Sequence, residues 1–239
     1  MEVHHPHHVT HKKKWNEYLL EFFMLFFAVF LGFVAENVRE GLAERHQEKE
    51  YILGMVQNLK DDTAQLHQVM PMLTLELKTL DSLIHLSKAE LTAQENLKAL
   101  GRFSNHTVYC FQFKSDDATI TQLKSGNLRL IQTDHVADSL LRYDYTTAMT
   151  EGQHQSMVKV YDDYIATNEE VYDIASSFDT TYTRNRVNPP ITTDKKILRL
   201  YFNRASIFYY AANYYLTLLE FQEKHASRLI QYLQKEYHL

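Results

Sequence analysis

The sequence contains little glycine, proline and cysteine, and each shortage excludes a class of structure. Six glycines and four prolines among 239 residues amount to about a third of the usual combined share of roughly 12%. Turns must therefore be few and regular elements long, which predicts an all-α protein. No two glycines have the GxGxxG or GxxxxGK spacing, so nucleotide-binding loops of those types are excluded.

The single cysteine, Cys110, excludes an intrachain disulfide and a cysteine-based zinc site. The sequence shows no Cys-His grouping around it, so we expect a small buried hydrophobe or an inert thiol rather than a nucleophile. The net charge is −5, and the one basic cluster, at 12–14, is too small for a nucleic-acid footprint. Nucleic acid is therefore not an expected partner.

Catalytic motifs are also lacking, since the sequence has neither the HExxH pattern of zinc proteases nor the GxSxG nucleophile elbow. Its acidic pairs are formed by adjacent residues, which lie on different faces of a helix and are expected on solvated surfaces. These pairs are Asp61–Asp62, Asp116–Asp117, Asp162–Asp163 and Glu169–Glu170. We expect no catalytic residues and no cofactor, and a protein that is not an enzyme.

The chain does contain one long apolar run, YLLEFFMLFFAVFLGFVA at 18–35, with Glu21 as its only charge. Extended from Trp15 to Val38, it makes a helix of about 36 Å, which exceeds the roughly 30 Å of a bilayer's hydrocarbon core. A soluble helix that is apolar on every face would need a far larger core than the rest of the chain supplies. The sequence thus predicts a transmembrane helix at 15–38, with the lipid bilayer as a partner.

The residues around this run indicate its orientation. Trp15 and Tyr18 lie where an interfacial aromatic belt is expected, and the lysines at 12–14 lie just outside them. The far side carries as many basic residues, but they are diluted along an acidic helix. We expect a cytoplasmic His/Lys-rich tail at 1–14 and an extracytoplasmic helical domain at 39–239. Signal-peptide cleavage is not expected, because Phe33 occupies the −3 position of the only candidate site.

Three residues of the predicted span are candidates for function. An ionisable side chain such as Glu21 inside a membrane can carry protons, line a pore or join helices by hydrogen bonds. It lies about one turn inside the expected cytoplasmic boundary, so a structural role at the interface, or pairing with Lys14, is the alternative. Ala28 and Gly32 form a small-xxx-small pair that lets two helices approach closely, which predicts a homo-oligomer.

The tail before the span is rich in histidine, and imidazoles so close together bind Zn, Ni or Cu. The histidines concerned are His4, His5, His7, His8 and His11. A flexible tail offers no supporting hydrogen bonds to orient the rings. We therefore expect a weak divalent-metal affinity here, with an ordinary disordered tail as the alternative.

Beyond residue 39, apolar residues recur at spacings of three, four and seven, which predicts long helices. The first is expected to continue from the membrane span to Pro71. A second is expected to cover Met72 to Leu100 and to end at Gly101, so that the two form an antiparallel hairpin. Residues 101–115 lack the helical period and are expected to form a loop packed by its aromatic side chains.

Shorter helices are expected in the middle of the chain. Asp116 is the expected cap of a short helix that ends at Gly126 and Asn127. Thr133 or Asp134 is expected to begin the next, which ends near Tyr145. Together they make a helix-loop-helix corner.

Two long helices are expected to complete the domain. One runs from Glu151 to about Thr183 and is followed by a break at NRVNPPITTD, and the last covers about Thr193 to Tyr237. The tyrosine cluster at 209–215 is expected in the core and at the rim of the bundle rather than in a binding groove. The expected buried face of the last helix comprises Leu198, Tyr201, Ala205, Phe208, Ala212, Tyr215 and Leu219.

Three stretches resemble an uncharacterised family of short inner-membrane proteins from Bacteroidota. They are MEVHHPHHVTHKKKWNEYLLEFFMLFFAVFLGFVAENVRE at 1–40, EYILGMVQNLKDDTAQL at 50–66 and TITQLKSGNLRLIQTDHVADSLLRYD at 119–144. The features shared with the family are Glu21 near the start of the span, the Asn-x-x-Glu at 37–40 and the Ser-Gly-Asn-Leu corner at 125–128. The resemblance implies a bacterial inner membrane and a periplasmic domain, and it carries over no activity, substrate or catalytic residue.

Two functional hypotheses agree with these features. The first is a membrane-anchored helical interaction or sensory module without catalysis, which forms a homo-oligomer and binds another protein of the cell envelope. The second is an ion- or proton-conducting, stator-like oligomer in which Glu21 is the titrating group.

Overall fold

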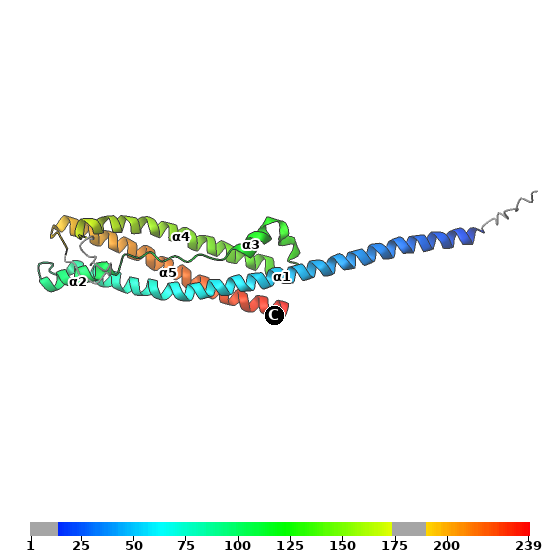
Figure 1. The fold of residues 1–239 in the computed structure, drawn as a ribbon, viewed down its shortest axis with the longest axis horizontal. Helices are drawn as coiled ribbons and strands as arrows, with labels where there is room; N and C mark the ends of the chain where they lie inside the picture. The colour runs from blue at the N-terminus through cyan, green and yellow to red at the C-terminus, as the bar shows by residue number, and fades with distance from the viewer. Residues whose placement is uncertain (1–13, 174–189) are drawn as a thin grey trace, which may run out of the picture. The chain divides into compact units, whose positions relative to one another are not determined.

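The computed structural model describes residues 14–173 and 190–239, and every regular element within those ranges is a helix. The expected all-α class is therefore confirmed. Figure 1 shows the elements in chain order. They are α1 (Trp15–His85), η1 (Leu86–Lys88), α2 (Gln94–Asn105), α3 (Ala118–Gln122), η2 (Leu123–Asn127), η3 (Leu128–Leu130), α4 (Val136–Val171) and α5 (Lys195–Tyr237). The chain divides into two compact units, 1–49 and 50–239.

In the first unit, α1 carries the apolar run. Every side chain at 18–35 is exposed, and the most apolar window of the helix has a mean hydropathy of 2.3 with none of it buried. By length and composition, α1 is long and apolar enough near the N-terminus to cross a membrane.

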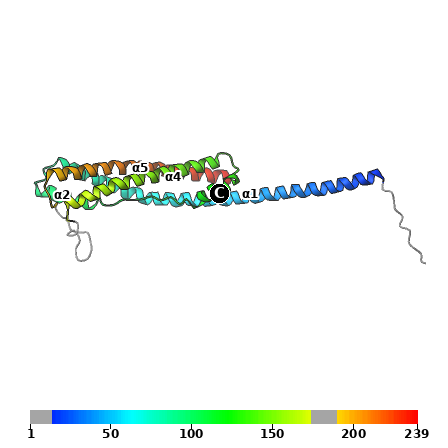
Figure 2. The ribbon, with the colours of Figure 1, turned by 90° about the horizontal axis from the view of Figure 1, so that it is seen from above.

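In the second unit, α4 and α5 pack side by side and run antiparallel, as both views of the ribbon show (Figures 1 and 2). Contacts between them fix the direction, because Gln222 pairs with Thr147 near one end and Arg204 with Asp163 toward the other. Residues 50–85 of α1 supply the third long helical surface.

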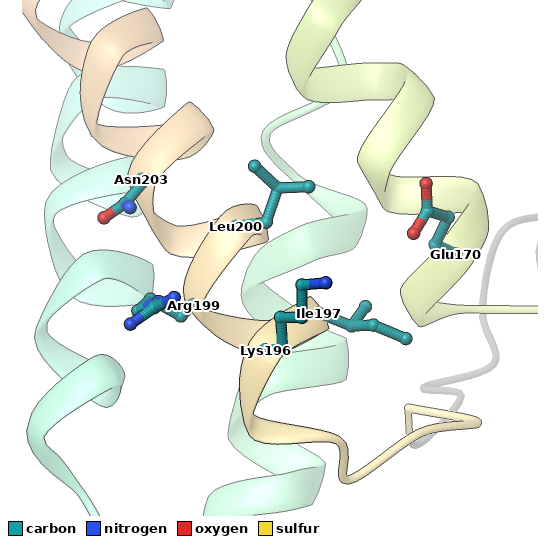
Figure 3. Close-up of a pocket in the computed structure, with 6 residues that line it drawn as sticks. All are labelled: Glu170, Lys196, Ile197, Arg199, Leu200 and Asn203. Carbon is teal, nitrogen blue, oxygen red and sulfur yellow. The ribbon is translucent and has the colours of Figure 1, made fainter.

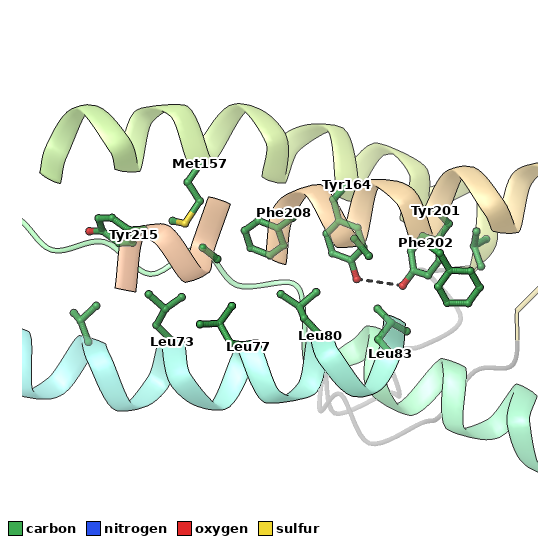
Figure 4. Packing of buried hydrophobic residues seen from close by; sticks show 14 of the residues in the cluster. Leu73, Leu77, Leu80, Leu83, Met157, Tyr164, Tyr201, Phe202, Phe208 and Tyr215 are labelled. Atoms are coloured by element: carbon green, nitrogen blue, oxygen red, sulfur yellow. Dashed lines mark hydrogen bonds between the residues drawn. The ribbon is translucent and has the colours of Figure 1, made fainter. Parts of the chain in front are cut away.

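The core of this unit consists of two apolar clusters, one at each end. In the larger cluster, leucines of α1 face aromatic rings of α4 and α5, as Figure 4 shows for Leu73, Leu80, Tyr164 and Phe208. The smaller cluster joins Ile52 and its neighbours to α3, the start of α4 and the end of α5. The buried face expected for the last helix is confirmed, since all seven of its residues are at most 5% exposed.

The last helix ends at Tyr237, as expected, and starts within two residues of the expected position. It begins at Lys195 rather than about Thr193, and the Asp194 side chain accepts hydrogen bonds from the backbone N–H groups of Lys196 and Ile197. An aspartate N-cap of this kind satisfies donors that a helix start leaves unpaired.

The hairpin expected at Pro71 is wrong, because α1 continues through Pro71 to His85. Proline removes one helical hydrogen bond and usually breaks a helix. Here Pro71 is exposed, so the carbonyl it leaves unpaired can meet water, while Val69 and Leu73 beside it are buried. Packing of the apolar face on both sides of the proline therefore outweighs the lost hydrogen bond.

The helix expected at Met72–Leu100 is also wrong in extent. The chain leaves the helix after η1, is non-helical at 89–93, and re-enters it as α2, with Gly101 buried inside α2 rather than ending it. A glycine inside a helix costs only about 1 kcal/mol relative to alanine, which burial of its neighbours offsets.

The two helices expected to meet between Tyr145 and Glu151 are one helix, α4, which runs through Gly152. It begins at Val136, after His135 in a left-handed conformation, rather than at Thr133 or Asp134. It ends at Val171, because Tyr172 is extended; the expected end near Thr183 lies outside the described residues.

Between α2 and α3, the chain follows α1 as an extended connection, which we call the strap (residues 106–117). Of the loop expected at 101–115, the first five residues are helical and the rest is confirmed as non-helical. An extended segment outside a sheet must find other hydrogen-bond partners for its backbone N–H and C=O groups. Side chains of α1 accept three of these hydrogen bonds. The backbone donors and their acceptors are Tyr109 with Glu76, Lys114 with Gln65, and Asp116 with Asp62.

The opposite side of the strap is held by tyrosines of α4 and α5. Tyr161 donates from its hydroxyl to the Val108 carbonyl at 2.8 Å, and the Phe113 N–H donates to the Tyr215 hydroxyl at 2.9 Å. The strap then enters α3, whose first N–H donates to the Asp116 carboxylate. The corner after α3 lies where it was expected, with Gly126 at φ +127°.

Candidate functional site

The candidate residues of the span share one face of α1. Glu21, Ala28 and Gly32 are separated by seven and four residues, which are close to whole helical turns. All three are exposed, and no atom lies within 4 Å of a Cβ placed on Gly32. A second helix can therefore approach this face of the span closely.

The phenylalanines of the span lie on a different face. Phe22, Phe26 and Phe30 stack along the helix with ring centroids 6.3 and 6.0 Å apart. Phe26 comes five residues after Glu21, which places it about 140° away around a helix that turns roughly 100° per residue. The apolar run is thus two-sided, with a carboxylate and small residues on one side and an aromatic ladder on the other.

The histidine-rich tail lies outside the described residues. Within 14–173 and 190–239, no group of three or more His, Cys, Asp or Glu side chains is arranged to hold a metal ion. Glu151 and His154 have the i, i+3 spacing that di-iron helices use, a pair that the sequence reading missed, but no third ligand joins them in the described part of the chain.

One buried carboxylate organises the junction of α1, the strap and α4. Asp62 is 2% exposed and accepts hydrogen bonds from the Ser115 hydroxyl, the Asp116 N–H and the Tyr143 hydroxyl. Burial raises the pKa of Asp62 despite these three donors. Burial and the nearby Asp62 together raise the pKa of the Tyr143 phenol well above its usual value, so Tyr143 remains a donor at neutral pH.

The burial of Asp62 corrects one sequence expectation. Of the acidic pairs expected on solvated surfaces, Asp61 is exposed but Asp62 is in the core. Adjacent residues of a helix point to different sides, and the strap covers the side that carries Asp62. The other three pairs are exposed as expected.

A second buried carboxylate, Glu76, lies about four turns farther along α1. It is 3% exposed, and its Oε1 accepts a 3.2 Å hydrogen bond from the Tyr109 N–H. Its Oε2 is buried and has no hydrogen-bond partner among the residues that the structure describes. Burial raises the pKa of Glu76 to about 8, and the bond from Tyr109 opposes this only in part.

The structure brings Cys110 to 4.0 Å from the His154 Nε2 atom, a Cys-His contact that the sequence did not show. The chemistry is not that of an activated thiolate. Burial, with the charges of Glu76 and Asp162, raises the pKa of the Cys110 thiol to about 11, and burial lowers the pKa of His154. Both groups are therefore neutral at pH 7, whereas a nucleophilic pair needs a thiol pKa below its normal value.

Two open grooves of the second unit lie at the end where α4 finishes and α5 begins. Figure 3 shows one of about 420 Å³, lined by Glu170 of α4 and by residues of α5 including Lys196, Arg199 and Asn203. A larger one of about 690 Å³ shares Arg199 and Asn203 and reaches Glu90 and Phe202.

The tyrosine cluster of α5 is divided between the core and the surface. Tyr215 is fully buried, whereas Tyr210 and Tyr214 are 73% and 52% exposed. The exposed ones belong to an apolar row on α5, which we call the α5 stripe. It comprises Leu200, Ile207, Tyr210, Tyr214 and Phe221, each at least 41% exposed. Four of its members are seven residues apart, and Tyr210 lies between two of them.

No protein-family model, no curated protein and no solved structure matches this chain.

Proposed function

We propose that this chain is a membrane-anchored helical interaction module, without catalysis, that forms a homo-oligomer in a bacterial inner membrane. The observation that carries the proposal is the wholly exposed apolar run of α1. More than ten large apolar side chains are exposed between Tyr18 and Val34. At about 1.5–3 kcal/mol each, removing them from water is worth on the order of 20 kcal/mol, so the run belongs in a membrane.

The proposed orientation places residues 1–14 in the cytoplasm and the helical domain in the periplasm. It is supported by the lysines at 12–14 and by the aromatic residues Trp15 and Tyr18 beside them. The resemblance to inner-membrane proteins of Bacteroidota agrees with this arrangement.

Protease digestion of spheroplasts tests the orientation. With an epitope at each end of the full chain, protease added outside should destroy the C-terminal epitope and spare the N-terminal one until detergent is added. The reverse pattern contradicts the orientation, and loss of both epitopes without detergent contradicts the anchor.

Self-association is supported by the α5 stripe. A seven-residue apolar repeat is the pattern that a second helix recognises, and a monomeric domain rarely leaves such a row uncovered. No charged residue occurs on α5 from Ala205 to Leu219, so a pairing helix meets no buried charge there. The same surface is available for an envelope protein that carries a matching helix.

The native mass of the full chain in nanodiscs tests this surface. Tyr214→Glu places a charge in the stripe and should shift the oligomer toward monomer. Ser156→Glu, on the exposed side of α4, adds the same charge elsewhere and should leave the mass unchanged. A monomeric wild type, or equal masses in all three proteins, contradicts pairing through α5.

A second candidate function, conduction of ions or protons, is favoured by the shared face of Glu21, Ala28 and Gly32. Helices that approach through the small residues bring several Glu21 carboxylates together, which is how a ring of charged side chains lines a pore. The span would then be the pore and the Phe ladder would face lipid.

A ring and its conductance are separately measurable. This candidate requires a native mass of four or more copies that Gly32→Leu reduces, and a proton or cation leak into liposomes that Glu21→Gln abolishes without changing the mass. Val34→Leu, about 160° around the helix from Gly32, is the matched control. A dimer or monomer contradicts conduction, because one or two spans cannot enclose a path.

A further inference from the structure

A groove of about 380 Å³ lies over Glu76, between α1 and the strap. It is separate from the apolar run and from the α5 stripe, so its role does not depend on the proposed function. Four of the residues that line it come from α1, and three come from the strap. They are Met72, Leu75, Glu76 and Thr79, with His106, Tyr109 and Phe111.

The acidic group of this groove is incompletely satisfied. Glu76 is only 3% exposed. One of its carboxylate oxygens accepts from the Tyr109 N–H, and the other has no hydrogen-bond partner in the described part of the chain. An unsatisfied buried carboxylate oxygen costs more free energy than a normal hydrogen bond contributes on balance. Anchoring the strap needs only one of the two oxygens, so the second is left for a donor from outside the chain.

The walls of the groove are apolar and aromatic. The rings of Tyr109 and Phe111 stack with centroids 5.9 Å apart and an interplanar angle of 24°. Met72 and Leu75 stand on the other side and are 44% and 66% exposed. Aromatic faces attract cations, and the attraction grows when the cation is shielded from water.

The residues of the groove also exclude other ligand classes. None of the described residues that line it is a lysine or arginine, so an anion would meet only the charge of Glu76. Glu76 and His106 are two metal-binding side chains, one fewer than a metal site requires. An organic cation matches both the acidic floor and the apolar walls.

We propose that this groove is a binding site for a small alkylammonium ion, whose ammonium group donates to Glu76 and whose alkyl chain packs against Tyr109, Phe111, Met72 and Leu75. The ammonium supplies the hydrogen bond that Oε2 lacks and neutralises the carboxylate. The aromatic pair covers the carbon atoms next to the charge.

Binding is coupled to proton release. The pKa of Glu76 is raised to about 8 by burial, so at pH 7 the empty site is mostly the neutral acid, and the ammonium displaces its proton. Affinity should therefore rise about tenfold from pH 7 to pH 9, below the alkylamine pKa of about 10.4. The other titratable groups near the site are His106 and Tyr109 on the walls, together with Cys110 and Tyr164, whose pKa values of about 11 and 12 lie above this range.

Calorimetric titration of the full chain in nanodiscs with n-butylammonium tests the site. We expect saturable binding to the wild type and at least tenfold weaker binding to Glu76→Gln. The uncharged alcohol 1-butanol, which has the same alkyl chain, should not bind in this way. Glu95→Gln, an exposed carboxylate on α2, is the control and should bind like wild type. The affinity of the wild type should show the tenfold rise between pH 7 and pH 9, and Glu76→Gln should lack it.

A second variant tests the site even if Glu76→Gln fails to fold. Tyr109→Ala removes an aromatic wall but retains the backbone N–H that Glu76 accepts, and it should weaken binding several-fold. Equal binding by wild type and Glu76→Gln, equal binding by wild type and Tyr109→Ala, or no saturable binding by the wild type at about 10 mM would each overturn the proposal.

Discussion

Tyr143 on α4 donates a 2.6 Å hydrogen bond to Asp62 on α1, across 81 positions of the sequence. The same carboxylate accepts from Ser115 and from the Asp116 N–H at the end of the strap. Three segments that are far apart in the chain therefore meet at one side chain that is 2% exposed. Asp62 thus links α1 to the strap and to α4. We expect its main role to be stabilisation of the fold.

Asp62→Ala should lower the free energy of unfolding by about 2–4 kcal/mol. The substitution removes the acceptor from three donors, and each buried donor left unpaired costs about 1–3 kcal/mol before the site relaxes. Urea unfolding of the full chain in nanodiscs, followed by the near-ultraviolet circular dichroism of the tyrosines, measures the change.

The adjacent residue provides the control. Asp61 is exposed, and its hydrogen bond from Gln57 is exposed as well. Asp61→Ala should therefore change the free energy of unfolding by less than about 0.5 kcal/mol. Equal effects at Asp61 and Asp62 would show that the hydrogen-bonded junction does not stabilise the fold.

Stability should fall as the pH rises from about 4.5 to about 8. Glu76 has a folded pKa of about 8 against an unfolded value of about 4.3, so between these values the folded chain holds a proton that the unfolded chain has lost. The full stabilisation is present below the unfolded pKa and is lost as the pH rises through the folded pKa. Asp62, whose pKa burial also raises, changes stability in the same direction.

The Glu76→Gln variant distinguishes the contribution of Glu76 to this pH dependence from that of Asp62. The amide cannot ionise, so the variant should lose less stability between pH 5 and pH 9 than the wild type, by a few kcal/mol. Urea unfolding at pH 5, 7 and 9 gives the two slopes, with Glu95→Gln as the control that keeps the wild-type slope. Parallel slopes for wild type and Glu76→Gln would mean that Glu76 is ionised in the folded chain at neutral pH.

The Cys110 thiol should react slowly at neutral pH. Its pKa of about 11 leaves much less thiolate at pH 7.5 than a normal pKa of about 8.5. We expect alkylation by iodoacetamide about 100-fold slower than in the urea-unfolded chain, with a rate that increases up to tenfold per pH unit from 8 to 10. A native rate equal to the unfolded rate would indicate that His154 activates the thiol after all.

The features of the fold that the sequence predicts correctly are those that depend on local pattern. The seven-residue buried face of α5, the exposed apolar run and the corner at Gly126 all follow from residue spacing or backbone preference. The errors occur at Pro71 and Gly101, where a residue that disfavours helix was taken to end one, and between Tyr145 and Glu151, where two helices were expected and one is found. Packing of the apolar face over many turns outweighs a local cost of about 1–3 kcal/mol.

The sequence could predict a candidate site only where its residues lie on one helix, so that their spacing in the sequence shows that they are close in space. Glu21, Ala28 and Gly32 are identifiable from their spacing on one helix. Asp62 and Glu76 look like ordinary surface acids in the sequence, because the strap that buries them begins thirty residues after Glu76. The contact of Cys110 with His154 likewise needs the strap to lie against α4.

Two glycines should respond in opposite ways to alanine. Gly126 has a φ of +127°, which an L side chain rarely adopts, so Gly126→Ala should destabilise the fold by about 1–3 kcal/mol. Gly152 lies inside α4 with no atom within 4 Å of an added Cβ, so Gly152→Ala should stabilise it by about 0.5–1 kcal/mol. Urea unfolding of both variants measures the difference. Destabilisation by Gly152→Ala would contradict a continuous α4 and would restore a break between Tyr145 and Glu151.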